Sequence, residues 1–502
     1  MSNYEVGHWI NGAASRGTGD RQQDIFNPAS GAVQGTLLLG SVADLDAAVA
    51  SATQAAKSWG QTPALARSRV LFKYLHLLQE RRGLMADAIV REHGKTLPDA
   101  LGEVARGIEN VEFATAMPTL LKGEYTEQIA RGLDAWNVRQ PLGVVAGVTP
   151  FNFPAMVPMW MYPLAIGCGN AFILKPSERV PSAALLMAQW LKEAGLPDGV
   201  FNVVQGDKSI VDAILAHPGI AAVSFVGSTP VAEHIYTTGS AHGKRVQALG
   251  GAKNHMVVMP DADLNQAVDA LMGAAYGSAG ERCMAISVAV AVGDMGDKLI
   301  AALAPKVAAL KIGEGHQAGM EMGPLITRAS QQRVERLIGE GIEAGATAVV
   351  DGRGCRVTGY EDGFFVGGTL LDGVSADMTC YSEEIFGPVL CVVRVPDLAA
   401  AIALIESNEY ANGVAIFTRD GQVAREFVHH IQVGMVGVNV PLPVPMAFNS
   451  FGGWKRSLFG DHHAYGPEGV RFYTRHKAVM QRWPDANSGG GKGPQFAFPQ
   501  NT

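Results

Sequence analysis

The chain has 502 residues, enough for about three domains of ordinary size, and 47% of them are hydrophobic. The 40 lysines and arginines and the 47 aspartates and glutamates give a net charge of −7, which leaves no basic excess for a nucleic-acid partner. Charged residues make up 17% of the chain, a composition that favours large covered cores and excludes a disordered protein.

Cysteines and apolar runs exclude two further classes. No uninterrupted apolar run approaches the roughly 20 residues of a membrane span, and the first residues lack a leader pattern. The cysteines are odd in number and widely spaced, so we expect neither a disulfide framework nor a metal site. We therefore expect a cytoplasmic protein that avoids membranes and keeps its thiols reduced. The five positions are Cys168, Cys283, Cys355, Cys380 and Cys391.

The first 120 residues are predicted to be largely helical. Apolar residues recur at helical spacing over 41–58 and over 64–92, and a third helix follows around 98–120. The segment 121–141 is more polar and strand-like, which indicates an excursion from the domain around it.

From Leu142 onward, short strands alternate with helices. A second alternating stretch begins at Asp261, an N-cap candidate, and runs to about residue 440. Such alternation implies βαβ units, so the predicted fold class is α/β, with two parallel-sheet domains and a small strand-rich excursion. The tail from Asn487 is rich in glycine and is predicted to be flexible. The expected strands are 144–148, 171–174, 200–204, 221–226 and 286–292, and the expected helices are 181–194, 209–215 and 231–237.

Polar residues follow two of the expected strands at their carboxyl ends, where parallel sheets bind ligands. Lys175 and Glu178 follow one strand, and a carboxylate there can accept hydrogen bonds from ribose hydroxyls. Gly227 and Ser228 follow another and open a helix, whose N-terminus can hold a pyrophosphate. Taken singly, Lys175 and Glu178 could be an ordinary surface pair, and Gly227 and Ser228 an ordinary helix cap. Both features together, on two strand ends, favour a nucleotide site.

Two further side chains are candidates for chemistry. Cys283 lies in a glycine-rich loop between a helix and an apolar strand, where Arg282 would favour its thiolate. The alternative is a buried structural cysteine, which we expect for the other four. Asn152 follows an apolar strand, and its amide is able to stabilise an oxyanion, although a turn-forming asparagine is the alternative.

These residues belong to motifs that resemble the aldehyde dehydrogenase superfamily over nearly the whole chain. The motifs stand in that family's order and spacing, and they are Phe151–Pro154, Leu174–Glu178, Phe225–Ser228, Gly280–Cys283 and Glu383–Pro388. Three more segments resemble the CoA-acylating methylmalonate-semialdehyde dehydrogenase branch: Gly250–His255, Asn439–Pro445 and Gln140–Trp160. Two positions depart from the family pattern: Glu281 stands where glutamine is common, and Ala232 where glycine is usual.

The resemblance implies that Cys283 is the catalytic nucleophile and that Asn152 donates to the oxyanion. It implies NAD as cofactor, coenzyme A as co-substrate and no metal. NAD is expected over NADP because Glu178 would repel a 2′-phosphate. The cofactor-binding residues that it implies are Phe151, Lys175, Glu178, Gly227, Ser228, Glu384 and Phe386.

The family fold also implies a division of the chain. An NAD-binding domain would comprise 1–122 and 142–252, and a catalytic domain 253–448. An oligomerisation region would comprise 123–141 and 469–486, followed by the flexible tail 487–502. The region that pairs across subunits implies a homotetramer or a homodimer.

Ala248 decides which reaction is expected. Hydrolytic members of the family carry a glutamate at this position, where it activates water, so its absence favours transfer of the acyl group to CoA. A hydrolytic aldehyde dehydrogenase that releases a free acid is one alternative. A non-catalytic binding or structural protein that retains the fold is another.

Two arginines are expected to clasp a substrate carboxylate, namely Arg106 and Arg282. With both engaged, methylmalonate and malonate semialdehyde would be preferred, and loss of CO₂ would give propionyl-CoA or acetyl-CoA. The alternative for Arg106 is a helix-surface ion pair with Glu103 or Glu109. The alternative for Arg282 is thiolate activation alone.

Overall fold

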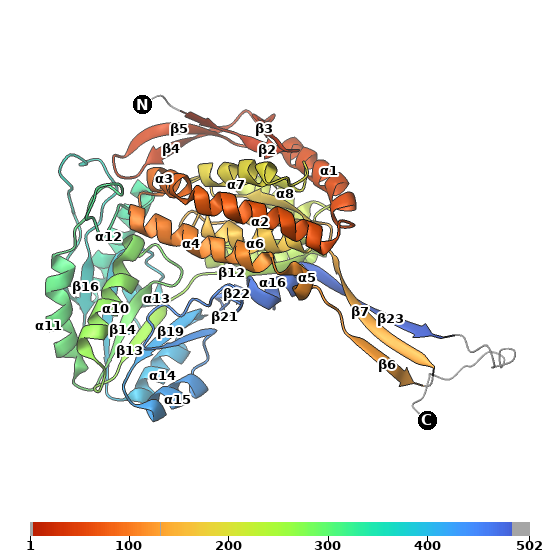
Figure 1. Ribbon diagram of the computed structural model, residues 1–502. Helices are drawn as coiled ribbons and strands as arrows, with labels where there is room; N and C mark the ends of the chain where they lie inside the picture. Colours follow the sequence, from red (N-terminus) through yellow and green to blue (C-terminus); the bar gives the residue numbers. More distant parts are fainter. Residues whose placement is uncertain (1–3, 131, 484–502) are drawn as a thin grey trace.

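The computed structural model describes residues 4–130 and 132–483 of the chain. They form two lobes, each built on a central sheet, and an arm of strands that projects from the first lobe (Figure 1). No helix within these ranges is long and apolar enough to cross a membrane. The tail predicted from Asn487 lies outside the described residues and stays a prediction.

The first lobe is built on an eight-stranded sheet whose five central strands are parallel. Most of these central strands are wholly buried, which explains their continuous apolar runs: both faces are covered. In spatial order the sheet runs β22 (Leu458–Phe459), β12 (Arg245–Leu249), β11 (Ala222–Val226), β8 (Val144–Val148), β9 (Ala171–Lys175), β10 (Phe201–Val203), β2 (His8–Ile10) and β3 (Ala13–Ser15).

Helices cover the two faces of this sheet and enclose separate apolar cores. One face packs against α1 (Val42–Trp59), α8 (Lys208–Ala216) and α9 (Thr229–Ala241). The core on the other face includes α2 (Ala64–Glu80), α3 (Arg82–His93), α4 (Leu97–Ala114), α5 (Met117–Leu120), α6 (Met156–Gly167), α7 (Ser182–Glu193) and α16 (Gly466–Phe472).

Three helices differ from the sequence expectation. The helix expected over 64–92 is interrupted at Arg81, where the backbone leaves the helical region (φ −106°, ψ 16°) and separates α2 from α3. The helix expected over 98–120 ends at Ala114, and the single turn α5 follows it. Sequence analysis missed α6, because all of its residues are buried and no amphipathic period results.

The second lobe is built on a seven-stranded sheet that is parallel except at one edge. In spatial order it runs β15 (Thr347–Val350), β16 (Thr369–Asp372), β17 (Val389–Val395), β14 (Ile286–Val292), β13 (Asn254–Val258), β19 (Gly413–Phe417) and β20 (Met435–Val438). Its helices are α10 (Leu264–Tyr276), α11 (Met295–Ala308), α12 (Arg328–Glu343), α13 (Thr379–Ser382), α14 (Leu398–Ser407) and α15 (Gly421–His430).

The N-cap of α10 corrects an expectation. Asp263, not Asp261, caps this helix, and its side chain accepts a hydrogen bond from the backbone of Gln266. Asp261 instead accepts from the Thr418 hydroxyl and from the backbone N–H of Arg419. Two aspartates precede the apolar period of this helix, and the sequence pattern alone does not show which of them is the N-cap.

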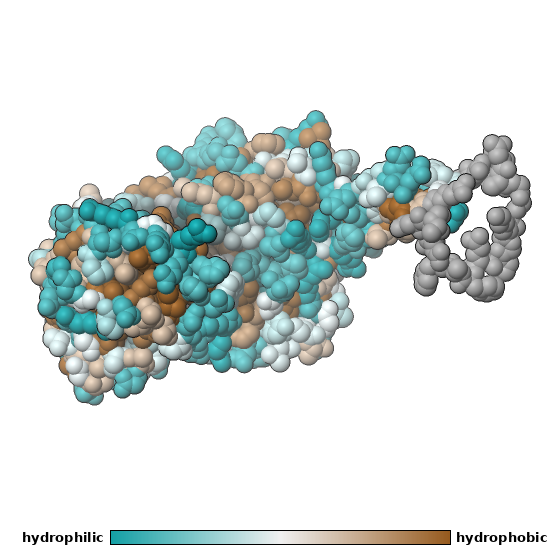
Figure 2. All heavy atoms as spheres, turned by 90° about the horizontal axis from the view of Figure 1, so that it is seen from below, coloured by the Kyte–Doolittle hydropathy of each residue, from teal (hydrophilic) through white to brown (hydrophobic). Residues whose placement is uncertain are grey.

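The arm consists of three antiparallel strands, β6 (Tyr125–Ala130), β7 (Leu133–Pro141) and β23 (Thr474–Arg482). β23 pairs with β7 along its whole length (Figure 1). Apolar side chains are exposed along the arm, among them Tyr125, Met480 and Trp483, and Figure 2 shows a hydrophobic patch there. Part of the expected 469–486 region differs, because 469–472 belong to α16 in the first lobe and 484–486 lie outside the described residues.

Short elements complete the fold. A three-stranded sheet of β1 (Tyr4–Val6), β5 (Ala32–Leu38) and β4 (Gln22–Asn27) lies beside the first lobe (Figure 1). The pair β18 (Tyr410–Ala411) and β21 (Trp454–Lys455) joins the segment that follows residue 448 to the second lobe. That segment then returns to the first sheet as β22, a crossing that the expected domain division did not include.

Candidate active site

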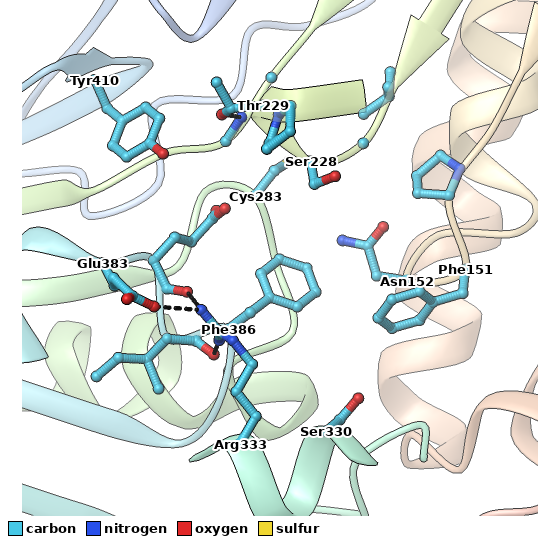
Figure 3. A pocket seen from close by; sticks show the side chains of 18 of the residues that line it. Phe151, Asn152, Ser228, Thr229, Cys283, Ser330, Arg333, Glu383, Phe386 and Tyr410 are labelled. Atoms are coloured by element: carbon cyan, nitrogen blue, oxygen red, sulfur yellow. Dashed lines mark hydrogen bonds and ion pairs between the residues drawn. The ribbon is translucent and has the colours of Figure 1, made fainter. Parts of the chain in front are cut away.

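A cavity of about 500 Å³ separates the two lobes and brings together most of the predicted site residues. The carboxyl ends of β8 and β11 form one wall, and loops of the second lobe form the other (Figure 3). Of the predicted residues, those lining the cavity are Phe151, Asn152, Gly227, Ser228, Cys283, Glu384 and Phe386.

The end of β11 supplies a helix N-terminus to the first-lobe wall. Ser228 is the N-cap of α9 and is exposed, and within the described chain its side chain makes no capping hydrogen bond. The Thr229 hydroxyl accepts a hydrogen bond from the backbone N–H of Gly251, which ties the end of β12 to this turn. The backbone N–H groups and the dipole at the start of a helix favour an anion such as a phosphate.

Asn152 extends from the end of β8 into the same cavity (Figure 3). Its side-chain amide donates a hydrogen bond of 3.0 Å to the backbone carbonyl of Glu281, and the backbone carbonyl of Asn152 accepts one of 2.5 Å from the Lys95 ammonium. Because an amide nitrogen carries two hydrogens, the second can serve an oxygen placed in the cavity.

Aromatic rings of the two lobes meet across the cavity. The rings of Phe151 and Phe386 lie edge to face, with centroids 5.9 Å apart at 85°. Phe386 has a positive φ of 56°, a strained conformation for a residue with a Cβ atom. The strain indicates that the 383–388 motif is held in one shape by its neighbours.

Cys283 lies three residues after a tight left-handed turn, the 3₁₀ element η1 (Gly277–Gly280). A Cβ atom on Gly280, which has φ +71°, would lie 2.1 Å from the carbonyl oxygen of Gly387, so only glycine fits there. The amides of Asn254 and Asn412 both donate to the backbone carbonyl of Cys283, at 2.9 and 3.2 Å. The nucleophile candidate is thus anchored through its backbone carbonyl.

The thiol of Cys283 is not acidic in this arrangement. Burial, followed by the nearby carboxylate of Glu384, raises its pKa to about 12, and backbone N–H groups and Arg282 oppose this only weakly. Arg282 therefore acts on the thiol in the expected direction, but burial and Glu384 outweigh its effect. Its guanidinium pairs with Asp99 at the start of α4 and also reaches the carbonyl of Gly273.

Glu384 faces the cavity from the second lobe, where its carboxylate accepts from the backbone N–H of Ala252 at 3.0 Å. Burial raises the pKa of this carboxyl to about 7. Arg333 from α12 holds the segment in place by donating to the carbonyls of Glu384 and Ile385. The buried Lys253 ammonium binds the same segment through the carbonyls of Cys380 and Glu383.

Lys175 and Glu178 lie at the end of β9, the next strand after β8 in the sheet. Their charged groups are 3.3 Å apart, so the two residues form the ion pair of the alternative, although Lys175 is buried and not on the surface. Burial lowers the pKa of the Lys175 ammonium. Both lie outside the described lining of the cavity, and their predicted contact with an adenine ribose stays a prediction.

Arg106 makes the ion pair that its alternative predicted. Its guanidinium lies 2.6 Å from the carboxylate of Glu109 and also donates to the carbonyls of Val444 and Pro445. The two arginines do not converge on one point. Arg282 pairs with Asp99, which lies two helical turns before Arg106 on α4. The shared carboxylate clasp therefore stays a prediction.

Sequence analysis missed several residues that line the cavity, notably Thr229, Ser330, Arg333 and Tyr410. Nothing in the sequence pointed to Arg333, because a site arginine on an amphipathic helix cannot be told from one that only faces solvent. Across residues 4–130 and 132–483, there is no group of three histidine, cysteine or acidic residues placed to hold a metal ion.

Comparison with known proteins places this site in a family. The model of the aldehyde dehydrogenase family matches residues 15–479, so the chain belongs to that family. This assignment confirms the resemblance and the predicted α/β fold class.

Relatives within the family share nearly the full length of the chain. The malonate-semialdehyde dehydrogenase of Pseudomonas aeruginosa is 60% identical over 493 residues, which cover 98% of this chain and 99% of that protein. The methylmalonate-semialdehyde dehydrogenase structure from Oceanimonas doudoroffii is 56% identical, with a TM-score of 0.95 and coverage of 97% and 99%. A Sinorhizobium meliloti protein, provisionally given the same name and solved with NAD, is 54% identical, with a TM-score of 0.96 and the same coverage.

Proposed function

We propose that the protein is an NAD-dependent enzyme that oxidises methylmalonate or malonate semialdehyde and transfers the acyl group to coenzyme A, with loss of CO₂. The observation that carries this proposal is the meeting of Cys283 and Asn152 in one cavity between the lobes. The names of the Pseudomonas and Oceanimonas relatives support the choice of substrates.

The residues of the cavity fit a dinucleotide. The N-terminus of α9 at Ser228 is open to a pyrophosphate, and the Glu384 carboxylate can accept from ribose hydroxyls. The cavity volume falls within the range of small-molecule sites. NAD, when bound, accepts the hydride that leaves the aldehyde carbon. Glu178 favours NAD over NADP in this proposal, because its charge opposes a 2′-phosphate.

Cys283 attacks the aldehyde carbon as a thiolate, and the oxyanion receives hydrogen bonds from the Asn152 amide and from the backbone N–H of Cys283. Because burial and Glu384 raise the pKa of the thiol, we infer that its proton leaves only in the loaded site. Loss of hydride from the adduct leaves a thioester on Cys283.

Ala248 supports CoA as the acceptor. It lies buried in β12 with its side chain in the apolar core, so the position offers no carboxylate to activate water. General-base assistance of roughly 10²–10⁴-fold is then missing from hydrolysis. A thioester that water attacks slowly persists until the thiol of CoA arrives and exchanges with it.

Two further parts of the proposal concern the substrate and the assembly. Arg106 and Arg282 would contact the substrate carboxylate, for which Arg106 would have to release Glu109. The exposed apolar side chains of the arm support a homotetramer or a homodimer. The five free thiols support a reducing compartment, the cytoplasm.

Absorbance of NADH, followed with and without CoA, tests the proposal. We expect a burst of NADH without CoA, then a slow phase that CoA accelerates. Full turnover in CoA-free buffer would identify a hydrolytic dehydrogenase. Absence of NADH with every semialdehyde would leave a non-catalytic protein that retains the fold.

A further inference from the structure

A buried polar cluster lies behind Asn152 and Cys283, and the steps proposed above do not use it. Glu281 and His93 are both fully buried, with the carboxylate Oε2 3.8 Å from the imidazole Nε2. That distance is too long for a hydrogen bond, and neither atom has another partner among the described residues. Two buried polar atoms that lack hydrogen-bond partners destabilise the fold. Ionisation of the carboxyl would allow the two atoms to form a hydrogen bond.

Glu281 is connected to the oxyanion site through its own backbone. Its carbonyl accepts the hydrogen bond from the Asn152 amide, and two residues later the chain reaches Cys283. Its other carboxyl oxygen accepts from the backbone N–H of Ile326 at 3.2 Å. Any movement of this side chain therefore acts on the loop that carries both reacting groups.

His93 is set to receive a carboxylate. Its Nδ1 accepts from the backbone N–H of Lys95 at 3.3 Å, which leaves the proton of the neutral imidazole on Nε2, facing Glu281. The imidazole stacks on the ring of Phe151, with centroids 6.0 Å apart. Because Oε1 accepts from Ile326, a protonated Glu281 carries its proton on Oε2, which places one donor opposite another, whereas an ionised Oε2 would accept from the imidazole.

The cations near Glu281 and His93 already form ion pairs with other carboxylates. The Lys95 ammonium binds Glu103 at 2.8 Å, and Glu103 also accepts from the backbone of Ala155 at the start of α6. Arg282, which follows Glu281 in the chain, is paired with Asp99. No charge in the described surroundings is therefore left over for Glu281, and burial raises the pKa of its carboxyl to about 8.

We propose that Glu281 is a positioning residue that sets the alkaline limit of catalysis. While protonated it leaves the Asn152–Glu281 contact undisturbed. When it loses its proton to solvent, the carboxylate moves to the Nε2–H of His93 and displaces the loop that holds Asn152 and Cys283. This inference rests on the proposed thiol chemistry, because it concerns the groups that carry it.

Glu281→Gln tests the inference, since glutamine keeps the shape and cannot ionise. In the wild type we expect kcat/KM for propanal to fall about tenfold between pH 7 and pH 9, and in Glu281→Gln this fall should be absent. His93→Phe keeps a ring against Phe151 but removes the donor that stabilises the ionised form, so the fall should shift to higher pH. Glu112→Gln, on the exposed face of α4, is the matched control and should keep the wild-type profile.

Thermal unfolding gives a readout that needs no activity. A carboxyl with a pKa near 4.5 in the unfolded chain and about 8 in the folded one stabilises the fold at low pH and loses this contribution as pH rises. The Tm of Glu281→Gln relative to the wild type should therefore increase from pH 5 to pH 8 and then level off. A pH-independent difference would overturn the inference.

The two proposals fail in different ways. If Glu281→Gln forms NADH normally yet keeps the alkaline fall, the positioning role is overturned and the proposed function stands. If the wild type forms no NADH, the proposed function is overturned and the positioning role with it.

Discussion

The two walls of the active-site cavity are built by different physical means. In the first lobe, Asn152 and Ser228 follow adjacent parallel strands, whose hydrogen-bond ladder fixes where the chain ends. In the second lobe, loops carry the functional groups, and side chains from neighbouring elements hold the backbone of these loops. Arg333 and Lys253 bind backbone carbonyls of the segment that contains Glu384.

Because of this difference, one wall holds only groups whose charge is independent of pH, and the other holds groups that titrate. The first-lobe wall presents neutral amides, hydroxyls and backbone N–H groups, which do not change charge with pH. The second-lobe wall presents Cys283 and Glu384, and burial raises the pKa of both. Changes to the first wall should therefore alter rate or affinity equally at all pH values, and changes to the second should alter the pH dependence.

Cys283→Ser should have the largest effect, because a hydroxyl is a far poorer nucleophile than a thiolate. We expect NADH formation to fall about 10⁴-fold or more. Cys355→Ser is the control, since Cys355 lies away from the cavity lining and should leave the rate unchanged. An active Cys283→Ser variant would remove the nucleophile from its assigned position.

Asn152→Ala deletes the proposed oxyanion donor on the opposite wall. Loss of such a donor costs about 10²–10³-fold in kcat, and the KM for NAD should stay close to that of the wild type. Single-turnover measurement of NADH formation checks this, because it isolates the chemical step. A variant that loses NAD affinity but keeps its single-turnover rate would show that Asn152 serves the cofactor.

Arg106→Leu tests the carboxylate contact. Removal of a charged hydrogen bond costs about 1.5–3 kcal/mol, so kcat/KM for malonate semialdehyde should fall about 10–100-fold while that for propanal is spared. Glu109→Gln frees the guanidinium from its ion pair and should not lower kcat/KM. Equal losses on both aldehydes in Arg106→Leu would make the arginine structural.

Glu384→Gln gives the smallest change and the sharpest test of the contrast between the walls. With a pKa of about 7, the carboxyl is ionised above that pH and accepts ribose hydroxyls better, so the KM for NAD should fall as pH rises through 7. The glutamine variant should lose this pH step. Ser228→Ala should raise the KM for NAD about 2–10-fold and keep the step. A step that survives in Glu384→Gln would belong to another group.

Much of the first lobe was predictable because strand ends leave a local signal. Apolar runs gave the strands, and the polar residues directly after them, such as Asn152 and Ser228, gave the wall. The motif around Cys283 also predicted the nucleophile candidate that lines the cavity. These features depend on residues close together in the chain.

What could not be predicted depends on distant partners. The ion pair of Arg282 with Asp99 joins residues 183 positions apart, and burial of Cys283 outweighs the small effect of Arg282 on the pKa of the thiol. The sequence shows that Glu281 departs from the family pattern, but it does not show that His93 faces this carboxyl. Burial and electrostatics of this kind are properties of the folded chain, and neither periodicity nor motif spacing contains them.

The pairing of β7 with β23 has a consequence for how the chain is made. The two strands lie about 340 positions apart, and contacts of such long range form late. During synthesis at 5–20 residues per second, the open edge of β7 has to wait roughly 20–70 s for its neighbour. An unpaired edge is a template for wrong partners, so premature termination before residue 474 would yield a product prone to aggregate.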